Sequence, residues 1–207
     1  MVKIKICGLK SPEDITYINK YQPEYIGFVF AISKRQLNDT QAAYLKELLD
    51  KKIQAVGVFV NEPMEHIIKL CRDKVIDMVQ LHGDEDEDYI LKLKNRISNP
   101  IIKAVRVQRA GQIEDMQKLS CNHLLLDTYS KNQFGGSGVT FDRGLIPDNC
   151  KPFFLAGGLN KDNIQEAIKD CSPYCVDISS GVETDGKKDE KKIMEIIELV
   201  RNVDHER

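Results

Sequence analysis

Eight short apolar segments recur along this chain at nearly even intervals, and this repetition limits the possible folds more than any other feature. Their first residues lie 22 to 30 positions apart, and each segment has four to six residues rich in Ile, Val, Leu or Phe. Such segments are typical of strands buried in a parallel sheet. We expect strands over residues 3–7, 25–30, 55–60, 78–81, 101–105, 123–127, 153–156 and 175–178.

Helical patterns fill most of the intervals between these segments. Ser11, followed by Pro12 and two acids, predicts a helix start with Ser11 as its cap. Asn160 predicts the cap of another helix, running to about residue 170. Apolar residues at helical spacing predict further helices over 41–51, 64–72, 89–97, 113–119 and 188–203. The interval 134–150 is rich in glycine and has no long helical stripe.

Eight strands alternating with seven or eight helices predict an α/β fold, a single compact (β/α)8 TIM barrel over residues 1–207. An open, doubly wound sheet is the alternative, but the even spacing and the count of eight favour the closed barrel. In such barrels the chemistry gathers at the carboxyl ends of the strands and on the loops that follow them. The strand ends are therefore where functional residues are expected.

The composition argues against several classes of protein. Thirty basic residues against 32 acidic ones leave a net charge of −2, without the basic excess of a protein that binds nucleic acid. No apolar run approaches the ~20 residues of a membrane helix, and the start of the chain lacks a signal-peptide pattern. The six cysteines contain no C-x-x-C pair, so we expect reduced thiols in a cytoplasmic protein. The four histidines are scattered, so no metal site is expected.

The alternation of side chains along a strand predicts which residues point into the mouth of the barrel. Lys5 and Cys7 point inward from the first strand, Gln80 and His82 from the fourth, and Asp127 from the sixth. Each has a plainer interpretation: buried filler for Cys7, a loop cap for Asp127, a backbone hydrogen bond for His82, and an ion pair for Lys5. The convergence of several such groups on one mouth favours a catalytic site.

Glycine-rich loops follow the last three strands. Backbone N–H groups in the loops after the seventh and eighth strands form the recurrent phosphate site of these barrels, and glycine allows the close approach. The residues expected to bind phosphate are Gly157, Gly158, Ser180 and Gly181. Plain tight turns are the alternative. The run after the sixth strand predicts a mobile flap over the substrate, made of Gly135, Gly136, Ser137 and Gly138.

The strand ends carry short motifs in a definite order. The motifs are KICG at 5–8, GFVF at 27–30, SKR at 33–35, VGVFVN at 56–61, VQLHG at 79–83, LLDT at 125–128, GGSG at 135–138, AGGLN at 156–160 and VDISSGVE at 176–183. In this order they resemble phosphoribosylanthranilate isomerase, an enzyme family of tryptophan biosynthesis. The resemblance covers nearly the whole chain, up to the GKKD motif at 186–189.

The resemblance implies an aldose–ketose isomerase that performs an Amadori rearrangement of N-(5-phosphoribosyl)anthranilate. It implies Cys7 as the general base, Asp127 as the general acid, and Arg35 as the contact of the anthranilate carboxylate. Lys5, on the same face as Cys7, is expected to favour the thiolate. The remaining pocket residues are expected to be Gln80, His82 and Asp177. The resemblance implies no cofactor, a small phosphorylated substrate as the partner, and a monomer.

Three other functions stay open. The aminoimidazole carboxamide ribotide isomerase of histidine biosynthesis is similar but uses two aspartates, whereas Cys7 ends the first strand here. Indole-glycerol-phosphate synthase shares the phosphate site but depends on catalytic lysines at strand ends, which we do not find. A phosphate-binding sensor without catalysis is the third, and the presence of both Cys7 and Asp127 argues against it.

Overall fold

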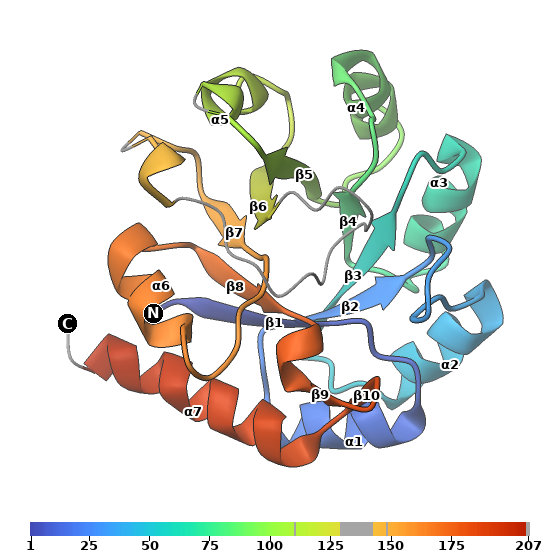
Figure 1. Cartoon of the computed structure of the whole chain (residues 1–207). Coiled ribbons are helices and arrows are strands. Elements are labelled where there is room, and N and C mark those ends of the chain that lie inside the picture. The colour runs from blue at the N-terminus through green and yellow to red at the C-terminus, as the bar shows by residue number, and fades with distance from the viewer. Residues whose placement is uncertain (110, 129–142, 148, 206–207) are drawn as a thin grey trace.

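Eight parallel strands pair in chain order and close on themselves, because β8 pairs with β1 (Figure 1). The computed structural model describes residues 1–109, 111–128, 143–147 and 149–205. The strands are β1 (Lys3–Cys7), β2 (Tyr25–Val29), β3 (Gln54–Phe59), β4 (Met78–Leu81), β5 (Ile101–Val107), β6 (His123–Thr128), β7 (Phe153–Leu155) and β8 (Cys175–Ile178). The predicted barrel is confirmed, and the open sheet is wrong.

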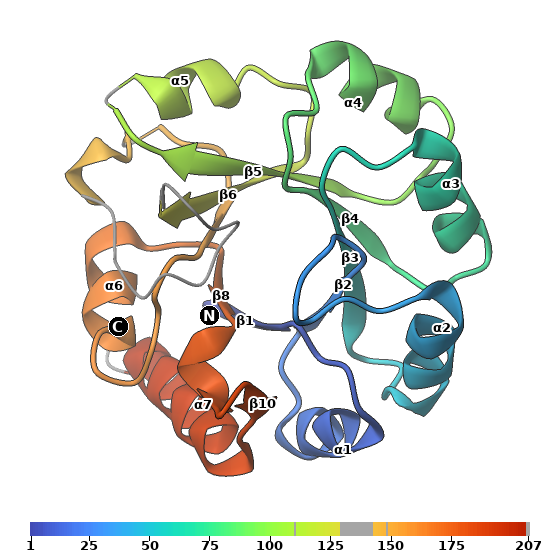
Figure 2. The same cartoon turned by 45° about the vertical axis from the view of Figure 1, so that its right-hand side comes forward.

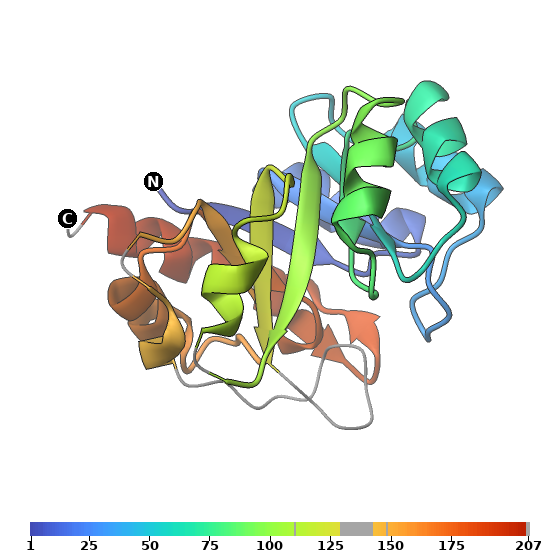
Figure 3. The ribbon, with the colours of Figure 1, turned by 90° about the horizontal axis from the view of Figure 1, so that it is seen from above.

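The helices form a ring outside the strands (Figure 2). They are α1 (Pro12–Tyr21), α2 (Asp39–Leu48), α3 (Met64–Arg72), α4 (Glu87–Lys94), α5 (Gln112–Met116), α6 (Ile164–Cys171) and α7 (Glu190–His205), with two short 3₁₀ helices, η1 (Arg143–Leu145) and η2 (Ser180–Val182). Helix α7 packs against both α6 and α1 and so closes the ring. The start of β1 and the end of α7 consequently lie on the same side of the molecule (Figure 3). No helix in the described ranges is long and apolar enough to cross a membrane.

Local sequence signals explain where most helices begin. Ser11 caps α1 as predicted, and its side chain and that of Asp14 form a reciprocal capping box. The predicted cap at Asn160 is wrong, because α6 begins only at Ile164, with Asn163 at the cap position. Asn160 instead shapes the turn before the helix: its Oδ1 accepts from the backbone N–H of Asp162 at 2.8 Å.

The last helix also begins later than predicted. The sequence predicts Lys188 as its first residue, but Lys188 lies in β10 (Lys187–Lys188), which pairs with β9 (Glu183–Thr184) in a small hairpin. The turn residues Asp185 and Gly186 both have positive φ, of 50° and 74°. Two such residues in a row are typical of the tight turn that joins hairpin strands. This hairpin directly follows η2 at the mouth of the barrel.

Two apolar layers hold the barrel together. One lies between the strands and the helices, and the smaller one fills the inside of the barrel. The inner layer consists of Tyr25, Val56, Met78, Ile102, Ala104, Leu125, Phe154, Ala156 and Cys175. The buried polar side chains of Lys5, Gln80 and Asp127 extend this interior toward the carboxyl ends of the strands. The barrel is therefore a packed core with a polar mouth.

Candidate active site

A cavity of about 460 Å³ opens at the carboxyl ends of the strands. The predicted site residues that line it are Cys7, Arg35, Gln80, His82, Asp127, Gly157, Gly158, Asp177 and Ser180. Gly181 lies just beyond this lining, and the predicted flap, Gly135, Gly136, Ser137 and Gly138, lies outside the described residues. The structure thus brings residues from β1, β2, β4, β6, β7 and β8, or from the loops after them, to one cavity.

A row of polar side chains crosses this mouth from β8 to β6. The buried ammonium of Lys5 donates to Asp177 Oδ2 at 2.8 Å and to Gln80 Oε1 at 2.9 Å. The amide nitrogen of Gln80 lies 2.8 Å from His82 Nδ1, and His82 Nε2 lies 3.5 Å from Asp127 Oδ2. Because Lys5 can only donate, it orients the amide so that Gln80 donates to Nδ1. We infer that neutral His82 carries its proton on Nε2, the nitrogen that faces Asp127.

The thiol of Cys7 lies buried at the end of β1, beside Gly27 of β2. Burial raises the pKa of this thiol above its ordinary value, and the charges of Lys5 and Lys188 act in the opposite direction. The charge of Lys5 favours the thiolate, but burial outweighs it, and the net shift of the Cys7 pKa is upward. The resting group at neutral pH is accordingly the thiol.

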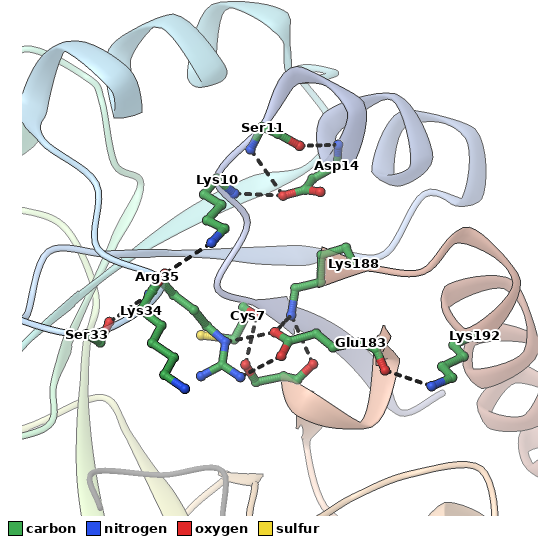
Figure 4. Close-up of polar contacts among 11 residues, drawn as sticks. Cys7, Lys10, Ser11, Asp14, Ser33, Lys34, Arg35, Glu183, Lys188 and Lys192 are labelled. Carbon is green, nitrogen blue, oxygen red and sulfur yellow. Dashed lines mark hydrogen bonds and ion pairs between the residues drawn. The ribbon is translucent and has the colours of Figure 1, made fainter. Parts of the chain in front are cut away.

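The guanidinium of Arg35 holds a carboxylate that belongs to the protein (Figure 4). Its Nε donates to Glu183 Oε1 at 2.8 Å and its Nη2 to Glu183 Oε2 at 2.7 Å. The ammonium of Lys188 binds the same Oε1 at 2.8 Å. Arg35 lines the cavity as predicted, but it does so as one member of a cluster of three charged side chains.

The sequence analysis did not predict the part that Glu183 and Lys188 play in this cluster. Glu183 lies in the VDISSGVE motif without a predicted role, and the sequence pattern predicts Lys188 at the start of a helix. The Asp185-Gly186 dipeptide was the available signal, because this pair is a strong indication of a two-residue hairpin turn. A hairpin there would have placed both side chains beside the mouth, at the end of the eighth strand.

The predicted phosphate loops lie against one another. Gly157 and Gly158 have φ of 88° and 66°, a conformation that favours glycine. A side chain at Gly181 would bring its Cβ to 2.0 Å from the backbone oxygen of Leu159, so only glycine allows this contact. Among the described residues, no hydrogen bond uses the backbone N–H of Gly157, Gly158, Ser180 or Gly181. These N–H groups can therefore bind an anion.

Apolar side chains form another part of the cavity wall. Phe30, Ile32, Val58 and Val60 line it, and the ring of Phe30 stacks on that of Phe59 with centroids 5.1 Å apart. Ile32 is 95% exposed in the loop after β2. The described residues contain no group of three or more His, Cys, Asp or Glu side chains that could hold a metal ion. The cavity thus combines an apolar wall, a row of polar groups and two glycine-containing loops whose backbone N–H groups are unused among the described residues.

Comparison with known proteins gives a consistent result. A family model described as N-(5'phosphoribosyl)anthranilate (PRA) isomerase matches residues 4–199. The N-(5'-phosphoribosyl)anthranilate isomerase of Endomicrobium trichonymphae is 52% identical over 203 residues, covering 98% of this chain and 100% of the relative. The phosphoribosyl anthranilate isomerase structure from Thermotoga maritima is 35% identical, with a TM-score of 0.87 and coverage of 98% and 100%.

Two further solved structures bear on ligand and assembly. One is a phosphoribosyl anthranilate isomerase in complex with reduced 1-(o-carboxyphenylamino)-1-deoxyribulose 5-phosphate, 34% identical to this chain, with a TM-score of 0.84 and coverage of 98% and 100%. The other contains monomers generated from the dimeric Thermotoga maritima enzyme, 35% identical, with a TM-score of 0.85 and the same coverage.

Proposed function

The chain belongs to the N-(5'-phosphoribosyl)anthranilate isomerase family, and from this premise we propose that Cys7 and Asp127 perform the proton transfers of its reaction. It is an isomerase of tryptophan biosynthesis that converts N-(5-phosphoribosyl)anthranilate to 1-(2-carboxyphenylamino)-1-deoxyribulose 5-phosphate. The observation that carries the proposal is that both side chains line one cavity, from the ends of β1 and β6.

The reaction needs an acid and a base in the same cavity. Opening the furanose ring requires a proton on the ring oxygen, which Asp127 supplies from its carboxylic acid form, while the anthranilate nitrogen forms an iminium with C1. The Cys7 thiolate then removes the proton from C2, and the resulting enaminol tautomerises to the ketone. No oxidant or reductant takes part, so the proposal includes no cofactor. Each such proton transfer is typically worth about 10²–10⁴-fold in rate.

The rest of the cavity suits the two ends of the substrate. We place the phosphate at the loops of Gly158 and Gly181, where backbone N–H groups and close packing favour an anion. The anthranilate carboxylate meets Arg35, and its ring lies along the apolar wall that contains Phe30. Gln80, His82 and Asp177 line the pocket between these ends as a row tied together by Lys5.

We also propose that residues 1–207 act as one domain, as a monomer, in the cytoplasm. The closed barrel supports the first point, because all eight strands share one sheet. None of the six cysteines, all among the described residues, forms a disulfide, which suits a reducing compartment. Because one relative is described as dimeric, sedimentation of the purified protein at several concentrations is the direct test of the monomer.

The test of the assignment follows the loss of anthranilate-type fluorescence from freshly made substrate. Cys7→Ala and Asp127→Asn should each lower kcat by at least about 10²-fold with little change in KM. Cys71→Ala is the matched control, because Cys71 is equally buried, at 9% exposure, but lies on α3 away from the cavity.

The double variant separates a shared role from two independent ones. If both groups serve one reaction sequence, the double variant should lose less than the product of the two single losses. Near-normal kcat in either single variant would refute the role of that residue. Absence of turnover in the wild-type protein, with analogue binding intact, would favour the sensor without catalysis.

A further inference from the structure

The carboxylate of Glu183 lies between two cations at the edge of the cavity. Arg35 binds it through Nε and Nη2, and Lys188 binds it through Nζ, with all three contacts between 2.7 and 2.8 Å (Figure 4). Two parallel hydrogen bonds from one guanidinium hold the plane of that guanidinium in a fixed direction. Glu183 therefore determines which part of Arg35 is left for a ligand.

The unused part of the guanidinium is Nη1. Among the described residues no hydrogen bond uses this nitrogen, whereas Nε and Nη2 are both occupied by Glu183. Arg35 lines the cavity, and its side chain is 28% exposed, while that of Glu183 is 9% exposed. A ligand carboxylate can thus reach Arg35 from the cavity while Glu183 stays bound on the other side.

The charges of the cluster decide whether a carboxylate gains by binding there. Arg35 and Glu183 alone form a pair with no net charge, which would attract a carboxylate only weakly. Lys188 adds one positive charge: its Nζ donates to Glu183 Oε1 and to the backbone oxygen of Ser179. Burial lowers the pKa of this group from its high ordinary value, and the charge and hydrogen bond of Glu183 oppose that shift and favour the ammonium. The cluster of three therefore keeps one net positive charge at the edge of the cavity.

We propose that Glu183 and Lys188 are a positioning pair for Arg35: Glu183 fixes the direction of the guanidinium, and Lys188 offsets the charge of Glu183 so that Arg35 still attracts the substrate carboxylate. This rests on the proposed function of Arg35 as the carboxylate contact. Neither Glu183 nor Lys188 touches the substrate in this scheme, and both act through Arg35.

Three contacts hold the pair in place. The ammonium of Lys192 on α7 binds the backbone oxygen of Glu183 at 2.7 Å, and Lys188 binds that of Ser179 at 2.9 Å. The hydroxyl of Ser179 in turn donates to the backbone oxygen of Cys7 at 3.1 Å. The side chain of Lys188 is only 2% exposed. The hairpin is thereby tied to the strand end that carries the proposed base.

The experiment measures how strongly each variant distinguishes two ligands. The probes are the reduced product analogue, 1-(2-carboxyphenylamino)-1-deoxyribulose 5-phosphate after reduction, and the same compound without its carboxylate. Titration calorimetry gives Kd for both, and their ratio is the preference for the carboxylate. Wild type, Lys188→Met, Lys188→Arg, Glu183→Gln, the double variant Glu183→Gln/Lys188→Met and Arg35→Ala are compared, with circular dichroism as the check of folding.

Lys188→Met should lower the preference about tenfold or more, because Glu183 then neutralises Arg35. Lys188→Arg should keep the preference within about threefold of wild type. The double variant should recover most of the preference, since Arg35 again carries an unopposed charge. A merely structural role for Lys188 predicts the opposite order, with the double variant at least as impaired as the single one.

Two results would overturn the proposal: an unchanged preference in folded Lys188→Met, or a double variant no better than Lys188→Met. If Lys188→Met does not fold, Glu183→Gln decides. Without the carboxylate that fixes its direction, Arg35 should keep its charge but lose about threefold in preference. An unchanged preference would overturn the positioning role of Glu183, and a loss as complete as that in Arg35→Ala would overturn the charge argument. Arg35→Ala distinguishes failure of the proposed function from failure of the positioning pair. If Arg35→Ala leaves the preference unchanged, Arg35 is not the carboxylate contact. If Arg35→Ala abolishes the preference while the Glu183 and Lys188 variants keep it, only the positioning pair is wrong.

Discussion

A methyl group added at Gly27 should displace the Cys7 thiol. It therefore tests the proposed role of Cys7 without changing Cys7 itself. Gly27 and Cys7 are direct neighbours across β1 and β2. A Cβ at position 27 would lie 2.5 Å from Cys7 Sγ, 3.1 Å from its Cα and 3.2 Å from its Cβ. Because uncrowded non-bonded contacts begin near 3.5 Å, the thiol must move by about 1 Å.

A displacement of this size has a large effect on catalysis and a modest one on stability. Misplacing a catalytic group by about 1 Å can cost on the order of 10²-fold in rate. Overpacking a core position typically costs about 1–3 kcal/mol of stability. Gly27→Ala should therefore lower kcat about 100-fold, change KM much less, and leave a folded protein. Stopped-flow fluorescence of the isomerisation and thermal unfolding measure these effects.

Gly57→Ala is the matched control. It lies on the neighbouring strand β3, and its Cβ would meet Phe59 and Ile76 at 2.8–2.9 Å, in the layer between the strands and the helices. It should lower the unfolding temperature comparably while keeping kcat within about threefold of wild type. If Gly27→Ala is folded and turns over like the control, the reaction does not depend on the position of the Cys7 thiol, and the assignment of Cys7 as the base is refuted.

Three further predictions concern metal, anion and acid. Activity should survive chelation by EDTA, and a loss that a divalent ion restores would reveal a metal site. A crystal soaked in sulfate should hold an anion at the loops of Gly157, Gly158, Ser180 and Gly181, and an anion bound only elsewhere would contradict this. Arg35 and Lys188 overcome the effect of burial and lower the pKa of Glu183 to about 2, so its stabilising contribution is complete above about pH 4.5 and is lost as the pH falls toward 2. With solvent screening, the ionised Glu183 side chain contributes roughly 2 kcal/mol to the free energy of unfolding. Chemical denaturation should therefore show that Glu183→Gln loses less stability than wild type between pH 7 and pH 3.

Local patterns in the sequence predicted the barrel and the faces of its strands. The alternation along each strand is a property of extended backbone, so it placed Cys7, Gln80 and Asp127 toward the cavity without knowledge of any partner. The cap at Ser11 followed equally from its neighbours in the chain. Asn160 shows the limit of such signals, because the turn after β7 uses this side chain before the helix begins.

Contacts between distant parts of the chain depended on closure of the barrel. Arg35 and Glu183 are 148 residues apart, and Lys5 and Asp177 are 172 apart. Spacing along the chain carries no information about such pairs, because they meet only when β8 pairs with β1.

The sequence by itself therefore determined which residues reach the mouth of the barrel, because the direction of a side chain follows from local backbone geometry. Only the tertiary structure decided what each of them meets there. The guanidinium of Arg35 already holds Glu183, and the proton of His82 follows from the orientation of Gln80, because hydrogen bonds and ion pairs require atoms within about 3 Å. The Cys7 thiol lies beside Gly27 because β1 and β2 pair at these two residues. Such distances are set by the packing of the closed barrel as a whole.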